Sequence, residues 1–496
     1  MRVITGNARR AWLAFVRPDR DPDEETGRFL DKPYASVQLL LLATVGLLGF
    51  GVMMAVSTTI AASHDTVGTG TGQIWSQVVK EAEFVLLGLP IFWVAMRLSP
   101  RAYRALAYPA LALACIVMVA VLVPGIGVAA YGARRWIDLG PLQLQPSEFA
   151  KVAMLLWGAD LLARKQQLGT LRRAKHLFVP LIPGFVFMIA LIMLEPDLGT
   201  TLCFLLILLG LLWMIGMPMR YFAALVLVIA GAVTLLAVAE PYRLARLTSF
   251  TDPFKDAQGS GFHTVESLYA LGSGGLWGVG LGDGTSKYWV PNANSDYVFA
   301  IIGEELGLLG AVAVLALFGL FAYTGMRIAR RNADPFVRLV AGAATIWLCG
   351  QAVINIGYVT GLLPVTGIPL PFISAGGTSL LVSFFVLGML TSFARHEAPA
   401  VTVARRAERL GHRSRVERWL RVPVPRPYSP PKRRRAPVPP PRTAPARTAS
   451  GRAASPRTAA PRSSAPARTR PARPAATRPA AVPLRATGTD GSRRTR

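Results

Sequence analysis

Long uncharged stretches constrain this chain more than any other feature of its sequence. Val37–Ser57 and Tyr221–Ala239 each hold about twenty residues without a charge, the length at which a helix spans ~30 Å of hydrocarbon. Several such stretches recur along the chain. In lipid, backbone polar groups can be satisfied only within helices or closed barrels. The pattern therefore predicts an all-α polytopic membrane protein.

About ten transmembrane helices are expected from these stretches. Their approximate limits are 36–58, 82–98, 106–124, 147–163, 177–194, 198–216, 221–240, 297–325, 337–360 and 377–394. Lys and Arg concentrate in the short connections after the second, fourth, sixth and eighth spans, a bias that marks the cytoplasmic side. Both termini are therefore predicted to be cytoplasmic. The longest internal loop, Pro241–Asp296 between helices 7 and 8, is predicted to lie outside.

The net charge of +27 lies mainly at the C-terminal end. Residues 395–496 hold 26 Lys and Arg against 4 Asp and Glu, whereas the first 394 residues hold 28 against 23. We therefore expect a cytoplasmic N-terminal segment 1–35, a ten-helix domain 36–394, and a basic Pro/Arg/Ala-rich disordered cytoplasmic tail 395–496. Within the tail, the pattern of Arg405–Arg421 predicts a short basic amphipathic helix. Charge confined to such a tail does not indicate a nucleic-acid binder.

Charged residues at the outer ends of the spans are the first candidates for chemistry, because charges in or near lipid are costly. Arg135 precedes the fourth span, and Glu148 and Lys151 lie in its first turns. Glu195 and Asp197 occupy the tight turn between the fifth and sixth spans. A capped helix and a solvated turn are the alternatives to a functional site. A buried Lys151 would need an anionic partner.

The long outer loop ends in a second group of candidates. Six glycines lie between 272 and 282, where they allow close backbone approach, and the apolar residues among them indicate packing rather than a linker. Asp296 lies where the loop meets the eighth span. It can cap that helix, or act as a general base beside a low-dielectric boundary that raises its pKa. Of Glu304 and Glu305, at least one should point into the bundle.

The third group begins with Asn355 near the end of the ninth span and continues through a segment broken by Pro and Gly that includes Ser374. It is predicted to face outward, either as a loop that lines a substrate site or as a plain connector. Templates for metal sites and for nucleophilic catalysis are absent, because the five His residues are scattered. The three Cys residues fall in apolar stretches, which favours buried thiols.

Several motifs, in their order along the chain, resemble a known family. They are GARRWIDLG, QPSEFAK, EPDLGTT, YRLARLTSFTDPF, YALGSGGLWGVGLG, PNANSDYVFAIIGEELG and INIGYVTGLLPVTGIPLPFISAGGTS. Together they resemble the SEDS family of bacterial cell-wall synthases (shape, elongation, division and sporulation) over nearly all of residues 36–394. Within that family the chain looks like the FtsW-like division branch.

The resemblance implies a peptidoglycan glycosyltransferase that polymerises lipid II at the outer face of the cell membrane during septal cell-wall synthesis. Asp296 matches the family's catalytic aspartate, the general base toward the GlcNAc 4-hydroxyl, and undecaprenyl diphosphate is the leaving group. Cations expected to hold the diphosphate are Arg135, Lys151, Arg243, Arg246 and Lys287. Glu305, Asn355 and Ser374 complete the expected substrate site. The one candidate cofactor is a divalent cation, Mg or Mn.

The resemblance also implies a class B penicillin-binding transpeptidase as partner. The basic tail is expected to bind anionic lipid or cytoplasmic division proteins. A lipid II flippase and a non-catalytic division scaffold are the alternatives. An aspartate at the outer face favours polymerisation, because a flippase should have charged groups reachable from both sides. Glu266, where the family usually has Gln, keeps the scaffold open.

Overall fold

The computed structural model describes most of the apolar body of the chain. The described residues are 30, 32–64, 72–130, 133–138, 140, 143–172, 174–238, 250, 252–259, 261–290, 293–410, 418 and 420–430. The chain divides into two units, 1–431 and 432–496, and every described residue belongs to the first.

Among the described residues, each expected span falls on a helix. The helices are α2 (Ala35–His64), α3 (Gly72–Arg97), α4 (Pro100–Leu122), α5 (Pro146–Leu168), α7 (Leu181–Leu194), α8 (Leu198–Met214), α9 (Met219–Val238), α12 (Val298–Arg331), α13 (Pro335–Val359) and α14 (Gly377–Arg395). By length and composition, α2, α4, α12, α13 and α14 are able to cross a membrane, and α7, α8 and α9 contain shorter apolar helices. The number of spans and their direction stay predictions.

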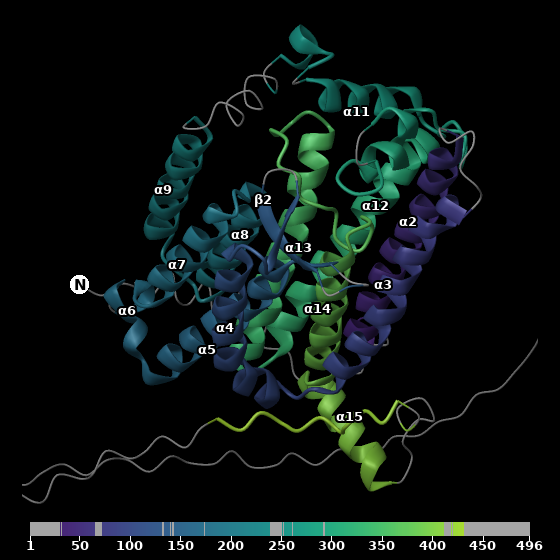
Figure 1. Ribbon diagram of the computed structural model, residues 1–496. Helices are drawn as coiled ribbons and strands as arrows, with labels where there is room; N and C mark the ends of the chain where they lie inside the picture. Colours follow the sequence, from purple (N-terminus) through teal and green to yellow (C-terminus); the bar gives the residue numbers. More distant parts are fainter. Residues whose placement is uncertain are drawn as a thin grey trace, which may run out of the picture. The chain divides into compact units, whose positions relative to one another are not determined.

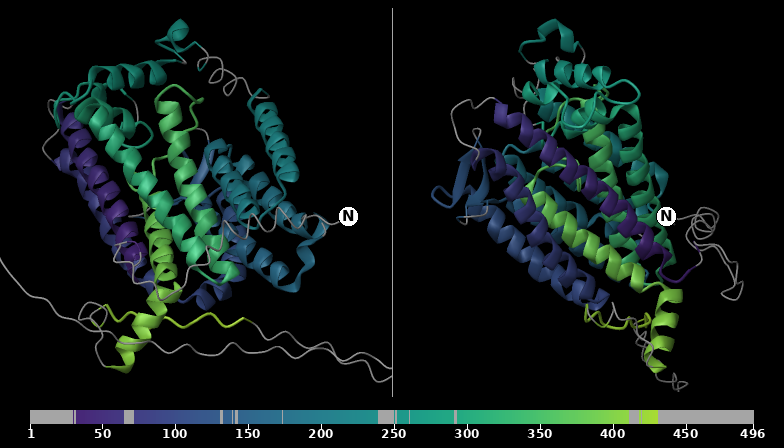
Figure 2. Two further views of the ribbon diagram at one scale, coloured as in Figure 1. Left: turned by 180° about the vertical axis from the view of Figure 1, so that it is seen from behind. Right: turned by 90° about the vertical axis from the view of Figure 1, so that its right-hand side faces the viewer.

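Shorter elements lie between these helices or follow the last of them. They are η2 (Thr170–Arg172), α6 (Ala174–Phe178), η3 (Pro253–Asp256), α11 (Phe262–Ser273), η4 (Ser286–Tyr288) and α15 (Ala398–Arg409). The helices α11 and α15 lie at opposite ends of the bundle (Figures 1 and 2). The outer loop between α9 and α12 therefore has helical structure of its own within its described part.

The expectation of an all-α fold missed a small antiparallel sheet. Its strands are β1 (Gly127–Ala130), β2 (Ala133–Asp138) and β3 (Gln143–Leu144), in the order β1-β2-β3. Val128 lies opposite Trp136, and Ile137 lies opposite Leu144. Strands this short show too few alternations of polar and apolar residues to be recognised from sequence. The sheet lies between α4 and α5 in the chain and carries Arg135.

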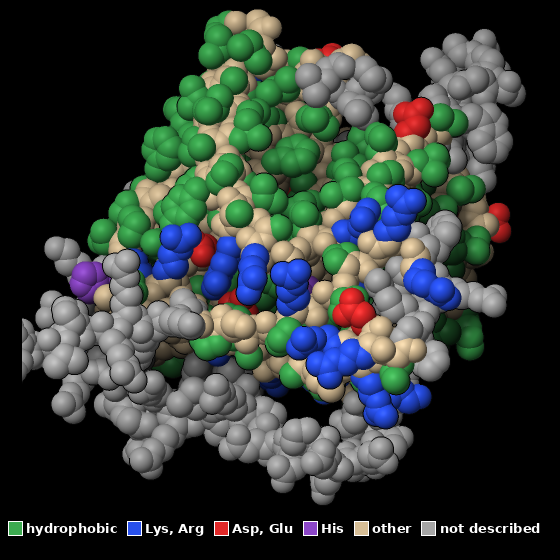
Figure 3. All heavy atoms as spheres, turned by 90° about the horizontal axis from the view of Figure 1, so that it is seen from below, with side chains coloured by type: hydrophobic (Ala, Val, Ile, Leu, Met, Phe, Trp, Pro, Cys, Tyr) green, Lys and Arg blue, Asp and Glu red, His purple; other side chains and the backbone are tan. Residues whose placement is uncertain are grey.

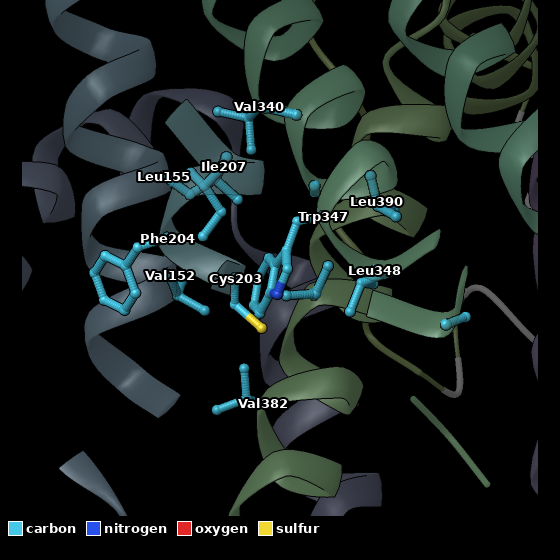
Figure 4. Packing of buried hydrophobic residues seen from close by; sticks show 14 of the residues in the cluster. Val152, Leu155, Cys203, Phe204, Ile207, Val340, Trp347, Leu348, Val382 and Leu390 are labelled. Atoms are coloured by element: carbon cyan, nitrogen blue, oxygen red, sulfur yellow. The ribbon is translucent and has the colours of Figure 1, made fainter. Parts of the chain in front are cut away.

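The helix α13 runs through the middle of the bundle, with α12 and α8 packed against it (Figure 1). Trp347 of α13 is buried in the apolar core, and in Figure 4 its indole lies beside Cys203 of α8. The indole N–H donates to Gln351 Oε1 at 3.1 Å. Satisfying that donor within the same helix lets a large aromatic side chain fill an apolar core.

The helix α12 is broken near its N-terminal end at Gly307, where φ is 66° and ψ is −163°. The glycine-rich loop supplies partners for the backbone groups that the break frees. The amide of Val279 donates to Glu304 O at 2.9 Å, and the amide of Leu308 donates to Gly275 O at 3.0 Å. A Cβ at Gly278 would lie 2.1 Å from Glu305 O. The expected role of these glycines, close backbone approach, is therefore confirmed.

The end of the bundle that carries α15 is strongly basic. Viewed from that end, Lys and Arg side chains form a band across the surface (Figure 3). This is the distribution that the positive-inside rule predicts for a cytoplasmic face. The basic helix differs from expectation in position: α15 begins at Ala398 rather than at Arg405, with Pro399 in its first turn. Residues 411–417 lie outside the described part.

Candidate functional site

Asp296 lies just before α12 and is held through its backbone. Its carbonyl oxygen accepts hydrogen bonds from Asn355 Nδ2 and from the Tyr358 hydroxyl, both at 2.9 Å. Asn355 Nδ2 also donates to Ile368 O at 2.7 Å. Asn355 and Tyr358 are fully buried on α13. The central helix therefore sets the position of Asp296 relative to the segment that follows it.

The segment between α13 and α14 packs directly on Asp296. The Ser374 hydroxyl donates to Ser295 O at 2.5 Å, and the Ala375 amide donates to Asn294 O at 2.9 Å. At Gly367, where φ is 69°, a Cβ would lie 3.6 Å from Asp296 Oδ2. The carboxylate thus faces this Pro/Gly segment, whose expected role in lining a substrate site stays a prediction.

Three rings in contact join α11, in the long loop between α9 and α12, to the region around Asp296. Tyr297 is buried, and its ring stacks on His263 of α11 at a centroid distance of 5.8 Å. On its other side it meets Tyr358 edge-on at 5.7 Å. Sequence reasoning assigned no role to His263 or Tyr358. The signal for Tyr358 was its spacing of three from Asn355, which places both on one helix face.

Lys287 and Glu305 form a fully buried ion pair at 3.0 Å. The Ser57 hydroxyl donates to Glu305 Oε1 at 2.5 Å, and Lys287 Nζ lies 2.7 Å from Gly282 O. Glu304 also points inward, where it accepts the amides of η4. Both glutamates therefore face the protein interior. The expected contacts of Lys287 and Glu305 with substrate stay predictions.

Arg135 fastens the turn between α7 and α8. Its Nε donates to Glu195 O at 2.8 Å, and one terminal nitrogen donates to Pro196 O at 2.6 Å. Asp197 caps α8 by accepting the Thr200 amide at 2.9 Å. The guanidinium is partly exposed and has five N–H donors, so donors remain for a further ligand.

The Glu195 carboxyl lies in that turn, outside the helices. It is fully buried, and neither of its oxygens has a hydrogen-bond partner. Burial raises the pKa of Glu195 to about 8; the nearby Asp197 carboxylate adds to the rise, and Arg135 opposes it. Glu195 is therefore largely protonated at neutral pH, unlike the solvated turn residue that is its alternative interpretation.

Lys151 has the anionic partner that its position requires. Its Nζ lies 2.8 Å from Glu148 Oε1 and 5.2 Å from the centroid of the Trp347 ring. A Cβ at Gly199 would lie 2.9 Å from Thr366 O and 3.6 Å from an Asp197 side-chain oxygen. Thr366 lies next to the α7–α8 turn, and the following residue, Gly367, lies next to Asp296, so this short segment separates the turn from Asp296. The expected residues Arg243 and Arg246 lie outside the described residues.

A metal site is not evident among the residues that the structure describes. Within them, no group of three or more His, Cys, Asp or Glu is placed to hold a metal ion. Of the outer carboxylates, Asp197 already accepts three hydrogen bonds. A divalent cation bound through a diphosphate needs only one or two protein carboxylates, so the expected cation requirement stays a prediction.

Comparison with known proteins matches this arrangement to a family. The family model described as "Cell cycle protein", which covers FtsW, RodA and SpoVE, matches residues 38–398. A Mycobacterium tuberculosis protein named "Probable peptidoglycan glycosyltransferase FtsW" is 43% identical over 413 residues, 83% of this chain and 77% of that protein. A Hahella chejuensis protein of the same name is 37% identical over 71% of this chain and 88% of its own.

Solved structures show the same fold. A chain from "Structural coordination of polymerization and crosslinking by a peptidoglycan synthase complex" has a TM-score of 0.59 and 27% identity, covering 72% of this chain and 96% of that one. The crystal structure of the Thermus thermophilus rod shape determining protein RodA has a TM-score of 0.51 and 26% identity over the same shares. The chain therefore belongs to the FtsW/RodA/SpoVE family of multi-pass membrane proteins.

Proposed function

We propose that this protein is a peptidoglycan glycosyltransferase that polymerises lipid II at the outer face of the cell membrane, with Asp296 as general base. The observation that carries this proposal is the fixed position of Asp296. Its carbonyl accepts hydrogen bonds from Asn355 and Tyr358, while its carboxylate faces the segment 366–368. Relatives at 43% and 37% identity carry the name peptidoglycan glycosyltransferase, which supports this activity over transport or scaffolding.

The proposed reaction needs one proton transfer and one displacement. The Asp296 carboxylate accepts the proton of the GlcNAc 4-hydroxyl of one lipid-linked chain. The oxygen then attacks the anomeric carbon of the other, its bond to undecaprenyl diphosphate breaks, and the configuration inverts. A base held rigidly at a partly buried position acts with little reorganisation, which lowers the barrier.

Charge on the departing diphosphate needs a cation. Of the described candidates, Arg135 is the best placed, because it is partly exposed and retains N–H donors, whereas Lys151 and Lys287 are buried against Glu148 and Glu305. A guanidinium can bind two phosphate oxygens at once. Arg135 is therefore proposed to hold the leaving group.

The proposed partner is a class B penicillin-binding transpeptidase. One structural relative belongs to a peptidoglycan synthase complex in which polymerisation and crosslinking are coordinated, which supports a partner that crosslinks. Action at the division septum and binding of anionic lipid or cytoplasmic division proteins by the basic tail belong to the same proposal. The family description, "Cell cycle protein", supports the septal location.

The test is polymerisation in vitro. Full-length protein with its transpeptidase partner is given labelled lipid II, and glycan strands are resolved on a gel. Strands are expected from the wild type and from Asp283→Asn, an exposed carboxylate of the same outer loop, and not from Asp296→Ala or Asp296→Asn. Strands that persist in Asp296→Ala would overturn the assignment of the base. Translocation of lipid II without strands would favour the flippase, and neither activity would favour the scaffold.

A further inference from the structure

The residues Leu420–Pro430 form a strap across the cytoplasmic end of the bundle. Figure 1 shows this strap, in yellow-green, running beneath the helices. Each contact comes from a different helix. The Trp93 indole N–H of α3 donates to Leu420 O at 3.0 Å, Arg395 of α14 donates to Pro423 O at 3.1 Å, and Gln167 of α5 donates to the Tyr428 hydroxyl at 3.2 Å.

The two buried side chains of the strap are three residues apart. Val422 and Pro425 are buried and Val424 and Tyr428 are half-buried, whereas Arg421, Pro423, Arg426, Pro427, Ser429 and Pro430 are exposed. A polyproline II helix has three residues per turn, so it presents every third side chain on one edge. The four prolines of the strap favour that conformation and remove N–H donors that would otherwise need partners.

The surface beneath the strap is built from side chains that also contact one another. Arg97 lies over the Trp93 ring at 4.4 Å, which orients the indole toward the strap. Arg104 pairs with Asp334 at 3.1 Å. Burial raises the pKa of the Tyr428 phenol, and the nearby Asp334 carboxylate adds to the rise, so the end of the strap lies close to that pair.

We propose that the cytoplasmic ends of α3, α5 and α14 form a binding surface for a polyproline II segment, and that the strap of this same chain is its reversible occupant. Polyproline II backbone carbonyls have no internal partners, so an indole N–H and a guanidinium recognise them directly, and aromatic contacts select the side chains. The strap is also the covalent link between the bundle and residues 432–496, which hold seventeen Lys and Arg. This proposal does not depend on the proposed function.

Limited trypsin digestion of the full chain in nanodiscs tests the proposal. Arg426 precedes Pro427, where trypsin does not cut, so Arg421–Val422 is the single tryptic bond within the strap. The basic run Lys432–Arg435 provides a reference site in the same molecule. Cleavage of each bond is followed by mass spectrometry. In the wild type, Arg421–Val422 should be cut about tenfold more slowly than the reference, because cleavage requires the strap to open. Equal rates would overturn the proposal.

Two substitutions of the strap give opposite expectations. Pro425→Asp places a charge on the docked edge without altering the scissile bond, and cleavage after Arg421 should rise to the reference rate. Ser429→Asp places the same charge on the exposed edge and should leave the rate unchanged. Gln167→Ala weakens the contact from the helix side, so it should accelerate cleavage without altering the strap. An unchanged rate in both Pro425→Asp and Gln167→Ala would contradict a docked strap.

A peptide tests whether occupancy is reversible. A synthetic peptide with the sequence Val422–Pro430 should compete for the surface and accelerate cleavage of Arg421–Val422 in the wild-type chain. The same peptide with Tyr428→Ala should compete at least several-fold less well, because it lacks the ring that Gln167 and the Asp334 region contact. No competition by the first peptide would show that the strap is a fixed part of the fold and would overturn reversible binding.

Discussion

At the scale of single residues, the position of Asp296 depends on three shared protons. Asn355 Nδ2 carries two and the Tyr358 hydroxyl carries one, and the nearby acceptors are Asp296 O, Ile368 O and the Tyr358 oxygen itself. Every donor has an acceptor only while both carbonyls stay in place. Removing one of these hydrogen-bond donors therefore weakens the hold on Asp296 relative to the segment 366–368, without changing any exposed surface.

Tyr358→Phe removes that one proton and keeps the ring. A net hydrogen bond of about 0.5–1.5 kcal/mol corresponds to a fall in kcat of roughly 3- to 10-fold. Tyr358 is fully buried, so the KM for lipid II should not change. Steady-state polymerisation kinetics measure both constants, with Tyr323→Phe, an exposed tyrosine of α12, as control. A higher KM with unchanged kcat would assign Tyr358 to substrate binding instead.

Glu195 makes stability depend on pH. The folded chain keeps this proton to about pH 8, whereas an unfolded Glu loses it near pH 4.5. The folded state therefore binds more protons between these values, and the free energy of unfolding falls as the pH rises through that window. Glu195→Gln should flatten this fall and should have a higher Tm than the wild type at pH 8.

The measurement is tryptophan fluorescence during thermal unfolding in detergent at several pH values between 5 and 8. Glu408→Gln, an exposed glutamate of α15, should keep the wild-type slope. A Glu195→Gln protein whose Tm falls with pH as steeply as that of the wild type would show that another group carries the dependence.

At the scale of elements, the break in α12 gives the outer loop a backbone partner. In a straight helix, the carbonyls of Glu304 and Glu305 would accept hydrogen bonds from amides one turn further along the same helix. Because of the break at Gly307, they instead accept hydrogen bonds from the amides of Val279 and Gly280. The loop is therefore attached to the same helix end that begins beside Asp296. This explains how a long loop between helices can present fixed groups to a site.

Gly307→Ala should disrupt that attachment. Its Cβ would lie 2.3 Å from Gly278 N, and the residue would have to keep φ near 66°. Strain and overpacking together predict a loss of about 1–3 kcal/mol and a lower Tm. Gly319→Ala, in the same helix with no atom within 4 Å of its Cβ, should be neutral or slightly stabilising. Equal Tm values for the two variants would contradict the proposed role of the break.

Physical reasons explain which of these elements could be predicted from the sequence and which could not. The spans were predictable because lipid leaves a helix as the ordinary solution for twenty uncharged residues. Outside the membrane no such rule applies, so the β1-β2-β3 sheet was missed. The candidates around Asp296 were predictable as charged and polar groups at the ends of apolar stretches. Their contacts were not: Lys287 pairs with Glu305 and Ser57, which lies 230 residues earlier in the chain.

At the scale of the whole molecule, charge separates into two kinds. In the described body, buried charges are paired, as Lys151 is with Glu148, or neutralised, as Glu195 is by its pKa. The excess positive charge lies at the α15 end and in the tail (Figure 3). The position of the net charge therefore supports the predicted membrane orientation, and the few buried charges mark the candidates for chemistry. In the chain, the strap lies between the body with its paired buried charges and the basic residues 432–496.

Two truncations follow from that division. A chain that ends at Pro430 keeps the strap contacts with Trp93, Arg395 and Gln167, so its Tm and its strand formation should equal those of the full chain. A chain that ends at Leu410 loses all three, and at about 1 kcal/mol for each hydrogen bond its Tm should fall by a few degrees. Thermal unfolding of both in nanodiscs makes the comparison. If the two chains melt together below the full-length protein, stability comes from residues after Pro430, and the folded domain extends further than the strap.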